Sequence, residues 1–208
     1  MFENFCIISS NCISGFWYRD IIKQEYEIPF IWSIVKLTDM LFLIDNFEKI
    51  NFNNVKAEMS DGEVNRRDGS KWVKIVLDNC VNVYFVHYRE NKNLNGESKI
   101  TGIDVVSSNI LKYTEDTWHR RCNRIPYGKK MVWVFWDDKI NTNTDLNKFI
   151  LAAKNRKNDL FVLFTPKAFE SKEENLFVLP ITNYNNVPKH TKDLEKLLKD
   201  YEETRVIQ

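Results

Sequence analysis

Uninterrupted apolar runs mark the segments that are expected to form buried strands. Residues 5–9, 131–136 and 160–164 carry apolar side chains at almost every position, which is typical of strands that are covered on both faces. Residues 72–77 and 81–86 are rich in β-branched and aromatic residues and are separated by a short Asp-Asn-Cys segment. These two runs predict a hairpin or a pair of neighbouring strands.

Helices are predicted where apolar positions recur at helical spacing between polar ones. The segments with this pattern are residues 14–26, 38–49, 116–124, 146–154 and 192–201. Strand, helix and strand in succession over residues 131–164 imply a right-handed crossover and a parallel pair of strands. A short strand is expected at 103–106, a surface loop or hairpin at 51–70, and a loop at 89–99.

The succession of strands and helices predicts the fold class. We expect a single α/β domain over residues 1–208, with a mixed, mostly parallel sheet flanked by helices. The hydrophobic fraction of 43% is enough for a sizeable core and excludes disorder for most of the chain.

Charge and hydropathy narrow the kinds of partner that fit. Thirty basic and 29 acidic residues give a formal net charge of +1, so no global field favours nucleic acid or an anionic membrane surface. No run reaches the ~18 apolar residues of a membrane span, and the start of the chain lacks the features of a signal peptide. We therefore expect a cytoplasmic protein that binds no nucleic acid and has no membrane span.

The four cysteines, at positions 6, 12, 80 and 122, are expected to be free thiols in a reducing compartment. They lack the close paired spacings of zinc or redox motifs, and they are too sparse for a disulfide scaffold. His119 and His190 are far from any ligand spacing that suggests a metal site. Glycine-rich phosphate loops and dinucleotide fingerprints are absent, so we expect no metal and no cofactor.

Cys12 is the candidate nucleophile because it stands where the first predicted strand gives way to a helix. Unpaired backbone N–H groups and the helix dipole would favour its thiolate over its thiol and lower its pKa. The same N–H groups would stabilise an oxyanion in a covalent mechanism. The alternative is that Cys12, like Cys6 and Cys80, is only a small buried apolar residue.

His87, Asp137 and Asp138 are the candidate partners of Cys12. Each follows a predicted strand, and parallel strands would bring their carboxyl ends together. His87 would take the proton from Cys12, and Asp137 or Asp138 would orient the imidazole. The alternatives are a histidine bonded to a backbone carbonyl and a solvated acidic turn.

The predicted helix at 116–124 carries a cluster of arginines. Arg120, Arg121 and Arg124 share part of a helical face and could bind a phosphate, a carboxylate or a sugar acid through paired hydrogen bonds. The alternative is a solvated helix surface with Trp118 packed inward.

Several segments of the chain share residues with a known family. They are Ile7 to Gly15, Tyr18, Ile28-Pro29-Phe30, Tyr84 to Tyr88, Trp118, Arg121, Arg124, Ile125 and Leu160 to Thr165. Together these segments resemble a bacterial family of unknown function that is described as exopolysaccharide biosynthesis protein, and the resemblance extends over most of the chain. The usual opening of that family is Ile-Ser-Asn-Asn-Cys-Trp-Gly-Gly, then a Tyr and Ser-Pro-Phe, and this sequence departs from it at Ser10, Ile13 and Ser14.

The resemblance implies a function in bacterial surface polysaccharide synthesis. A more distant similarity to proteins described as papain-like cysteine peptidases implies Cys12 as nucleophile and His87 as base. We therefore expect a group transfer or hydrolysis on a glycan precursor or another anionic small molecule. The candidate substrate-binding residues are Asn11, Tyr18, Trp118, Arg121 and Arg124.

Two other functions stay open at this stage. One is a glycosyltransferase-like enzyme in which Asp137 and Asp138 bind a metal and a sugar nucleotide and Cys12 is structural. The other is a non-catalytic partner in a polysaccharide assembly complex, with exposed aromatic residues and the segment 51–70 as its contact surface.

Overall fold

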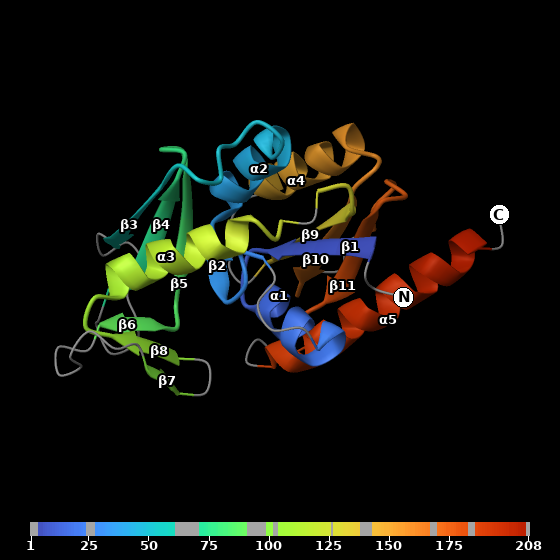
Figure 1. Ribbon diagram of the computed structural model, residues 1–208. Coiled ribbons are helices and arrows are strands. Elements are labelled where there is room, and N and C mark those ends of the chain that lie inside the picture. Colours follow the sequence, from blue (N-terminus) through green and yellow to red (C-terminus); the bar gives the residue numbers. More distant parts are fainter. Residues whose placement is uncertain are drawn as a thin grey trace. The chain divides into compact units, whose positions relative to one another are not determined.

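The chain folds into two compact units of mixed helix and strand. Residues 1–26 with 126–208 form the first, termed the parallel unit, and residues 27–125 form the second, termed the antiparallel unit. The computed structural model (Figure 1) describes residues 4–23, 28–60, 71–90, 99–101, 104–125, 127–137, 143–166, 170–182 and 186–206. The α/β class is confirmed, while the expected single domain stays a prediction.

The parallel unit is built on a four-stranded sheet in the order β1-β9-β10-β11, with every neighbouring pair parallel. Its strands are β1 (Phe5–Ser9), β9 (Lys130–Trp136), β10 (Leu160–Thr165) and β11 (Leu176–Pro180). The first three confirm the apolar runs in the sequence, and all residues of β1 and β10 are buried. β11 was not predicted.

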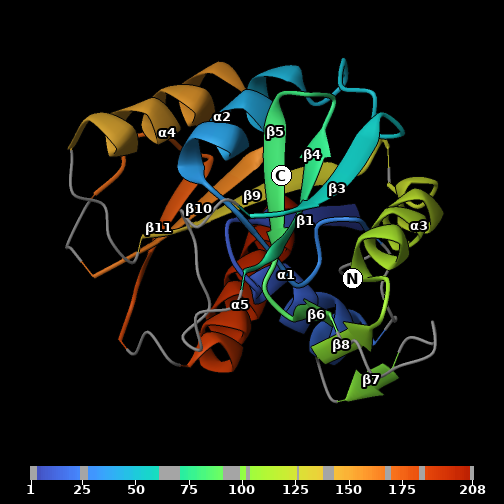
Figure 2. The same cartoon turned by 90° about the vertical axis from the view of Figure 1, so that its left-hand side faces the viewer.

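Helices cover both faces of this sheet. The crossover helix α4 (Asn143–Asn155) joins two parallel strands, as expected, and lies on one face, while α1 (Ile13–Phe16) and α5 (Val187–Val206) lie on the other (Figures 1 and 2). α1 has only four residues and continues as a π-helix, η2 (Trp17–Ile22), which ends at Lys23 with a φ of 58°. Of the helix predicted at 14–26, the described part is therefore mostly a π-helix, and residues 24–26 lie outside the described residues.

The antiparallel unit contains a four-stranded sheet in the order β2-β5-β4-β3, with every neighbouring pair antiparallel. The predicted hairpin forms its centre, and its turn uses Asp78 and Asn79 at φ 49° and 58°, the left-handed region that Asn and Asp tolerate best among side-chain-bearing residues. The strands are β2 (Ser33–Val35), β3 (Val55–Met59), β4 (Val73–Leu77) and β5 (Val81–Phe85). β3 lies inside the expected surface segment 51–70, of which residues 61–70 are outside the described residues.

A small three-stranded sheet completes the antiparallel unit. Its central strand β8 (Asp104–Ser107) confirms the short strand expected at 103–106. β8 pairs parallel with β6 (Tyr88–Glu90) and antiparallel with β7 (Lys99–Thr101). The expectation of a mostly parallel sheet is therefore correct for the parallel unit but wrong for the antiparallel unit.

Two helices pack within the antiparallel unit. α2 (Leu37–Asn46) contacts β5, and α3 (Ile110–Cys122) contacts β3 and β4, so both cover its larger sheet. The helix predicted at 116–124 is thus the second half of α3. None of the helices in the described part of the chain is long and apolar enough to cross a membrane.

Candidate functional site

The segment around Cys12 follows β1 at the carboxyl edge of the parallel sheet. Ser10 fixes its start, because its backbone N–H donates to the Val134 carbonyl at 2.9 Å and its hydroxyl accepts from the Trp136 N–H at 2.8 Å. These bonds continue the β1–β9 pairing beyond the last strand residue. The chain therefore enters the Cys12 turn from a fixed point.

Two more side chains of the same segment bond to the backbone of α1. Asn11 Oδ1 accepts from the Ile13 N–H at 3.0 Å, and Ser9 Oγ accepts from the Ser14 N–H at 3.0 Å. Both donors are therefore already bonded at the start of the helix. The expectation that these N–H groups stabilise an oxyanion is wrong for Ile13 and Ser14, and Asn11 has a structural bond of its own.

Cys12 is the N-cap residue of α1 and is partly exposed. Desolvation by burial raises the pKa of its thiol to about 12, well above the ordinary value for a cysteine. This is the opposite of the lowering expected from the sequence. The helix α1 has only four residues, and no basic residue stands in its last turn. Cys12 is therefore a neutral thiol at neutral pH, and a nucleophilic role requires a base.

Asp137 lies at the same edge of the sheet, directly after β9. Its side chain is buried, its N–H donates to the Phe164 carbonyl at 2.7 Å, and its Oδ2 accepts from the Thr165 hydroxyl at 2.8 Å. The parallel sheet thus brings the strand ends that carry Cys12, Asp137 and Thr165 to one edge, as expected for Cys12 and Asp137. Asp138 lies outside the described residues.

His190 is a residue of this edge that the sequence did not indicate. It is fully buried in the first turn of α5, and its ring packs against Trp136 at 5.0 Å and Phe164 at 5.6 Å between centroids. Its Nδ1 lies 3.2 Å from Asp193 Oδ2. The available signal was the His-x-x-Asp spacing, which puts both side chains on one side of a helix.

His87 follows β5 in the antiparallel unit and is paired with a carboxylate. Its Nδ1 lies 3.2 Å from Asp104 Oδ1, and Arg89 forms an ion pair with Asp104 Oδ2 at 3.1 Å. The ring of Trp32 meets His87 edge-on at 5.9 Å. Trp32 is itself buried at a φ of 58°, a strained conformation for a large side chain.

The position of His87 bears on two expectations from the sequence. The structure pairs His87 with Asp104, and a role of Asp137 or Asp138 in orienting His87 stays a prediction, since Asp138 lies outside the described residues. The strands that precede Cys12 and His87 were expected to share a parallel sheet, and this is wrong, because β1 belongs to the parallel sheet and β5 to the antiparallel one. The convergence of Cys12 and His87 stays a prediction.

Most of the candidate substrate-binding residues have structural contacts. Tyr18 is buried, and its hydroxyl accepts from the Ile7 N–H at 3.2 Å. Trp118 is buried in the antiparallel unit and donates from Nε1 to the Phe52 carbonyl at 2.8 Å. In this conformation both side chains are inaccessible to a substrate.

The arginines of α3 differ in exposure. Arg121 is buried and hydrogen-bonds to Tyr88, whose pKa is raised by burial and drawn down in part by this arginine. Arg120 is exposed, and so is Arg124, which lies two residues beyond the end of α3. Arg121 therefore stabilises a buried phenol. The exposed surface of α3 carries only Arg120 of the three arginines that were expected to share a helical face.

The cysteines and the possible metal ligands complete the description of the candidate site. All four cysteines are free thiols, as expected. Within the described ranges, no three His, Cys, Asp or Glu side chains are grouped closely enough to hold a metal ion.

Part of the chain is similar to a known protein domain. Residues 2–100 match a domain of unknown function, DUF1919, and this segment contains both Cys12 and His87. No curated protein matches the chain.

Proposed function

We propose that this protein is a cysteine-dependent enzyme of bacterial surface polysaccharide synthesis that acts on a glycan precursor by group transfer or hydrolysis. Cys12 is the nucleophile, and the carboxyl edge of the parallel sheet is its site. The observation that carries the proposal is the turn itself, in which Ser9, Ser10 and Asn11 each bond to the backbone and hold Cys12 in one position. The similarity of the opening segment to the exopolysaccharide family supports the class of substrate.

The chemistry starts from a neutral thiol, since burial raises the Cys12 pKa. A histidine accepts the S–H proton as sulfur attacks the acyl-type centre, a new S–C bond forms, and the bond to the leaving group breaks. The proton then passes from the histidine to the leaving group. A hydroxyl group of the acceptor or of water attacks the thioester and gives its proton to the histidine, the S–C bond breaks, and the histidine returns the proton to the Cys12 sulfur. The reaction therefore requires no oxidant or reductant.

Two histidines have the carboxylate partner that such a base needs. His87 is the base expected from the sequence, and Asp104 at 3.2 Å fixes its orientation. His190, paired with Asp193 at the same distance, belongs to the same unit as Cys12. Substitution of each histidine separately identifies which one assists Cys12.

The experiment uses p-nitrophenyl acetate as a simple acyl donor. We expect one acetyl group on Cys12, detected by mass spectrometry of the digested protein, together with a burst of p-nitrophenol. Cys12→Ala should lose both signals. Substitution of the assisting histidine by Ala should slow acetylation by about a hundredfold, the lower range for general base catalysis.

Cys80→Ala is the matched control, because Cys80 is an exposed thiol on the turn between β4 and β5. It should leave the burst unchanged. Acetylation of Cys80 and lysines without a label on Cys12 would show that Cys12 is not a nucleophile and would leave a structural role for it.

A further inference from the structure

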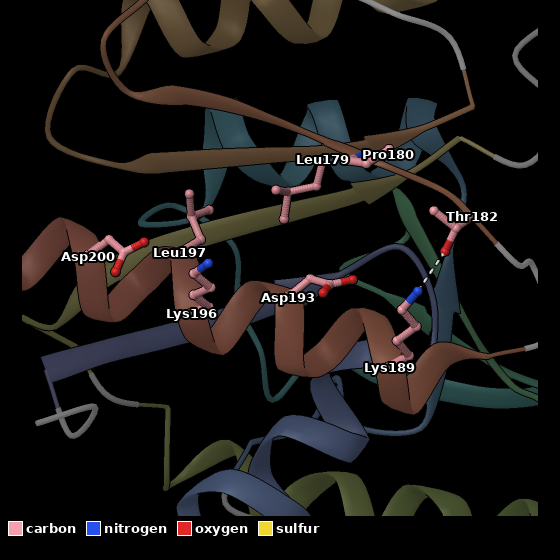
Figure 3. A pocket seen from close by; sticks show the side chains of 8 residues that line it. All are labelled: Leu179, Pro180, Thr182, Lys189, Asp193, Lys196, Leu197 and Asp200. Atoms are coloured by element: carbon pink, nitrogen blue, oxygen red, sulfur yellow. Dashed lines mark hydrogen bonds between the residues drawn. The ribbon is translucent and has the colours of Figure 1, made fainter.

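A pocket lies between β11 and α5 in the parallel unit (Figure 3). Its volume is about 340 Å³, near the lower end of the range for small-molecule sites, roughly 300–1,000 Å³. β11 ends at this pocket, so the pocket opens at the carboxyl end of a strand of the parallel sheet. The lining residues are Leu179, Pro180, Thr182, Lys189, Asp193, Lys196, Leu197 and Asp200.

Four charged side chains of alternating sign come from α5. Lys189, Asp193, Lys196 and Asp200 follow one another at helical spacing along one side of the helix (Figure 3). Lys189 Nζ donates to the Thr182 hydroxyl at 3.1 Å, which leaves two of its three protons for a ligand. Within the described part of the chain, no ion pair within 4 Å engages the ammonium group of Lys196 or the carboxylate of Asp200.

Asp193 connects the pocket to the edge of the sheet. Its Oδ2 bonds to Nδ1 of His190, whose ring packs on Trp136 and Phe164 near the ends of β9 and β10. A ligand that bonds to Asp193 therefore changes the charge environment of a buried imidazole. This contact provides a readout for occupancy of the pocket that is independent of turnover.

We propose that this pocket binds a sugar that carries an anionic group, a carboxylate or a phosphate. The ammonium groups of Lys189 and Lys196 bind the anion, and the carboxylate of Asp200 accepts hydrogen bonds from hydroxyl groups. Leu179, Pro180 and Leu197 contact the C–H faces of the ring. A neutral sugar leaves the two ammonium groups unused, and a simple anion leaves Asp200 unused.

The ligand class rests on the proposed function, because a glycan precursor is the substrate that the enzyme would act on. The binding itself does not depend on Cys12. The Cys12→Ala variant should bind the same sugars as the wild type, whatever its activity, so a failure of the catalytic proposal and a failure of this one give different results.

The experiment is an NMR titration of the full chain that follows the His190 ring signals and the backbone amides of α5. The probes are glucuronic acid and glucose 1-phosphate, with glucose and inorganic phosphate as separate controls. We expect a charged sugar to shift both sets of signals and to bind about tenfold more tightly than either control. Which of the two charged sugars binds more tightly identifies the anionic group.

The matched variants are Lys196→Ala and Lys199→Ala. Lys196 lines the pocket, whereas Lys199 is on the same helix, pairs with Glu195 at 3.1 Å and does not line the pocket. Lys196→Ala should weaken binding of the charged sugar by about tenfold, and Lys199→Ala should not change it. The proposal would be overturned if no charged sugar bound, or if glucose or inorganic phosphate bound as tightly as the charged sugars. It would also be overturned if Lys196→Ala and Lys199→Ala changed the affinity equally.

Discussion

Nδ1 of His87 lies 3.2 Å from Oδ1 of Asp104, and the other oxygen of that carboxylate forms an ion pair with Arg89 at 3.1 Å. A carboxylate that accepts from Nδ1–H holds a neutral histidine in the tautomer whose Nε2 is an acceptor. We predict that Asp104→Asn makes the protonated-Nδ1 tautomer less abundant. Long-range ¹H–¹⁵N NMR spectra of the imidazole nitrogens measure this directly.

Arg89→Ala is the control for this prediction, because it removes a charge next to Asp104 without removing the carboxylate. It should leave the His87 tautomer largely unchanged. If Asp104→Asn and wild type give the same tautomer populations, the Asp104 contact does not orient His87.

A second prediction concerns the buried pair Asp137 and Thr165. The Thr165 hydroxyl donates to Asp137 Oδ2 at 2.8 Å, and both residues are buried. Thr165→Val keeps the shape of the side chain but leaves the carboxylate without this donor, so the free energy of unfolding should fall by about 1–3 kcal/mol. Thr165→Ser keeps the hydroxyl and should lower the free energy of unfolding by less. Urea denaturation measures both changes. An equal decrease in the two variants would mean that side-chain packing, not the hydrogen bond, is responsible.

The sequence predicted the elements whose patterns are long and unbroken. β9 and β10 are uninterrupted apolar runs, and their buried parallel pairing follows from the helix between them. β2, β6 and β7 have three residues each, too few to show a period. The segment Trp17–Ile22 forms a π-helix, and the spacing of its apolar residues alone does not distinguish a π-helix from an α-helix.

The candidate site was less predictable than the fold because its pairings are not local. Asp104 is 17 residues from His87 in the sequence, and it reaches His87 only because β6 and β8 pair. The pattern over residues 72–86 fits either a hairpin or a pair of neighbouring strands, so it does not decide whether β5 belongs to a parallel or an antiparallel sheet. The raised pKa of Cys12 depends on packing around the sulfur, which the sequence pattern does not report.

A third prediction follows from the buried thiols. Burial raises the pKa of the Cys6 thiol and of the Cys122 thiol, each to about 12 and well above the ordinary value for a cysteine. The folded state therefore holds these protons more tightly than the unfolded state, so their stabilising effect is complete below about pH 9 and is lost as the pH rises towards 12. Between these limits the free energy of unfolding should fall by up to roughly 1.4 kcal/mol per pH unit for each thiol.

Urea denaturation at several alkaline pH values tests this slope. Cys122→Ala should lower stability near neutral pH, because it leaves a cavity, and it should make the alkaline loss less steep. Cys80→Ala, at an exposed thiol, is the comparison and should change the slope less. An unchanged slope in Cys122→Ala would show that Cys122 does not titrate in this range in the folded protein.

The last prediction separates a nucleophilic Cys12 from a structural one by the pH dependence of its alkylation with iodoacetamide. Without a base, the rate at Cys12 follows the thiolate and rises roughly tenfold per pH unit over the whole range below its raised pKa of about 12. With a histidine that accepts the proton, the rate instead rises as the imidazole loses its proton, near a pH of about 6.5 for an ordinary histidine, and then levels off. We expect the wild type to show the profile that levels off, and one of the variants His87→Ala and His190→Ala to show the profile that keeps rising. Cys80 in the same digest is the internal reference. The variant that changes the profile identifies the base. A wild-type profile that rises steadily into the alkaline range, unchanged in both variants, would mean that no histidine assists Cys12 and that its thiol serves the packing of the turn after β1.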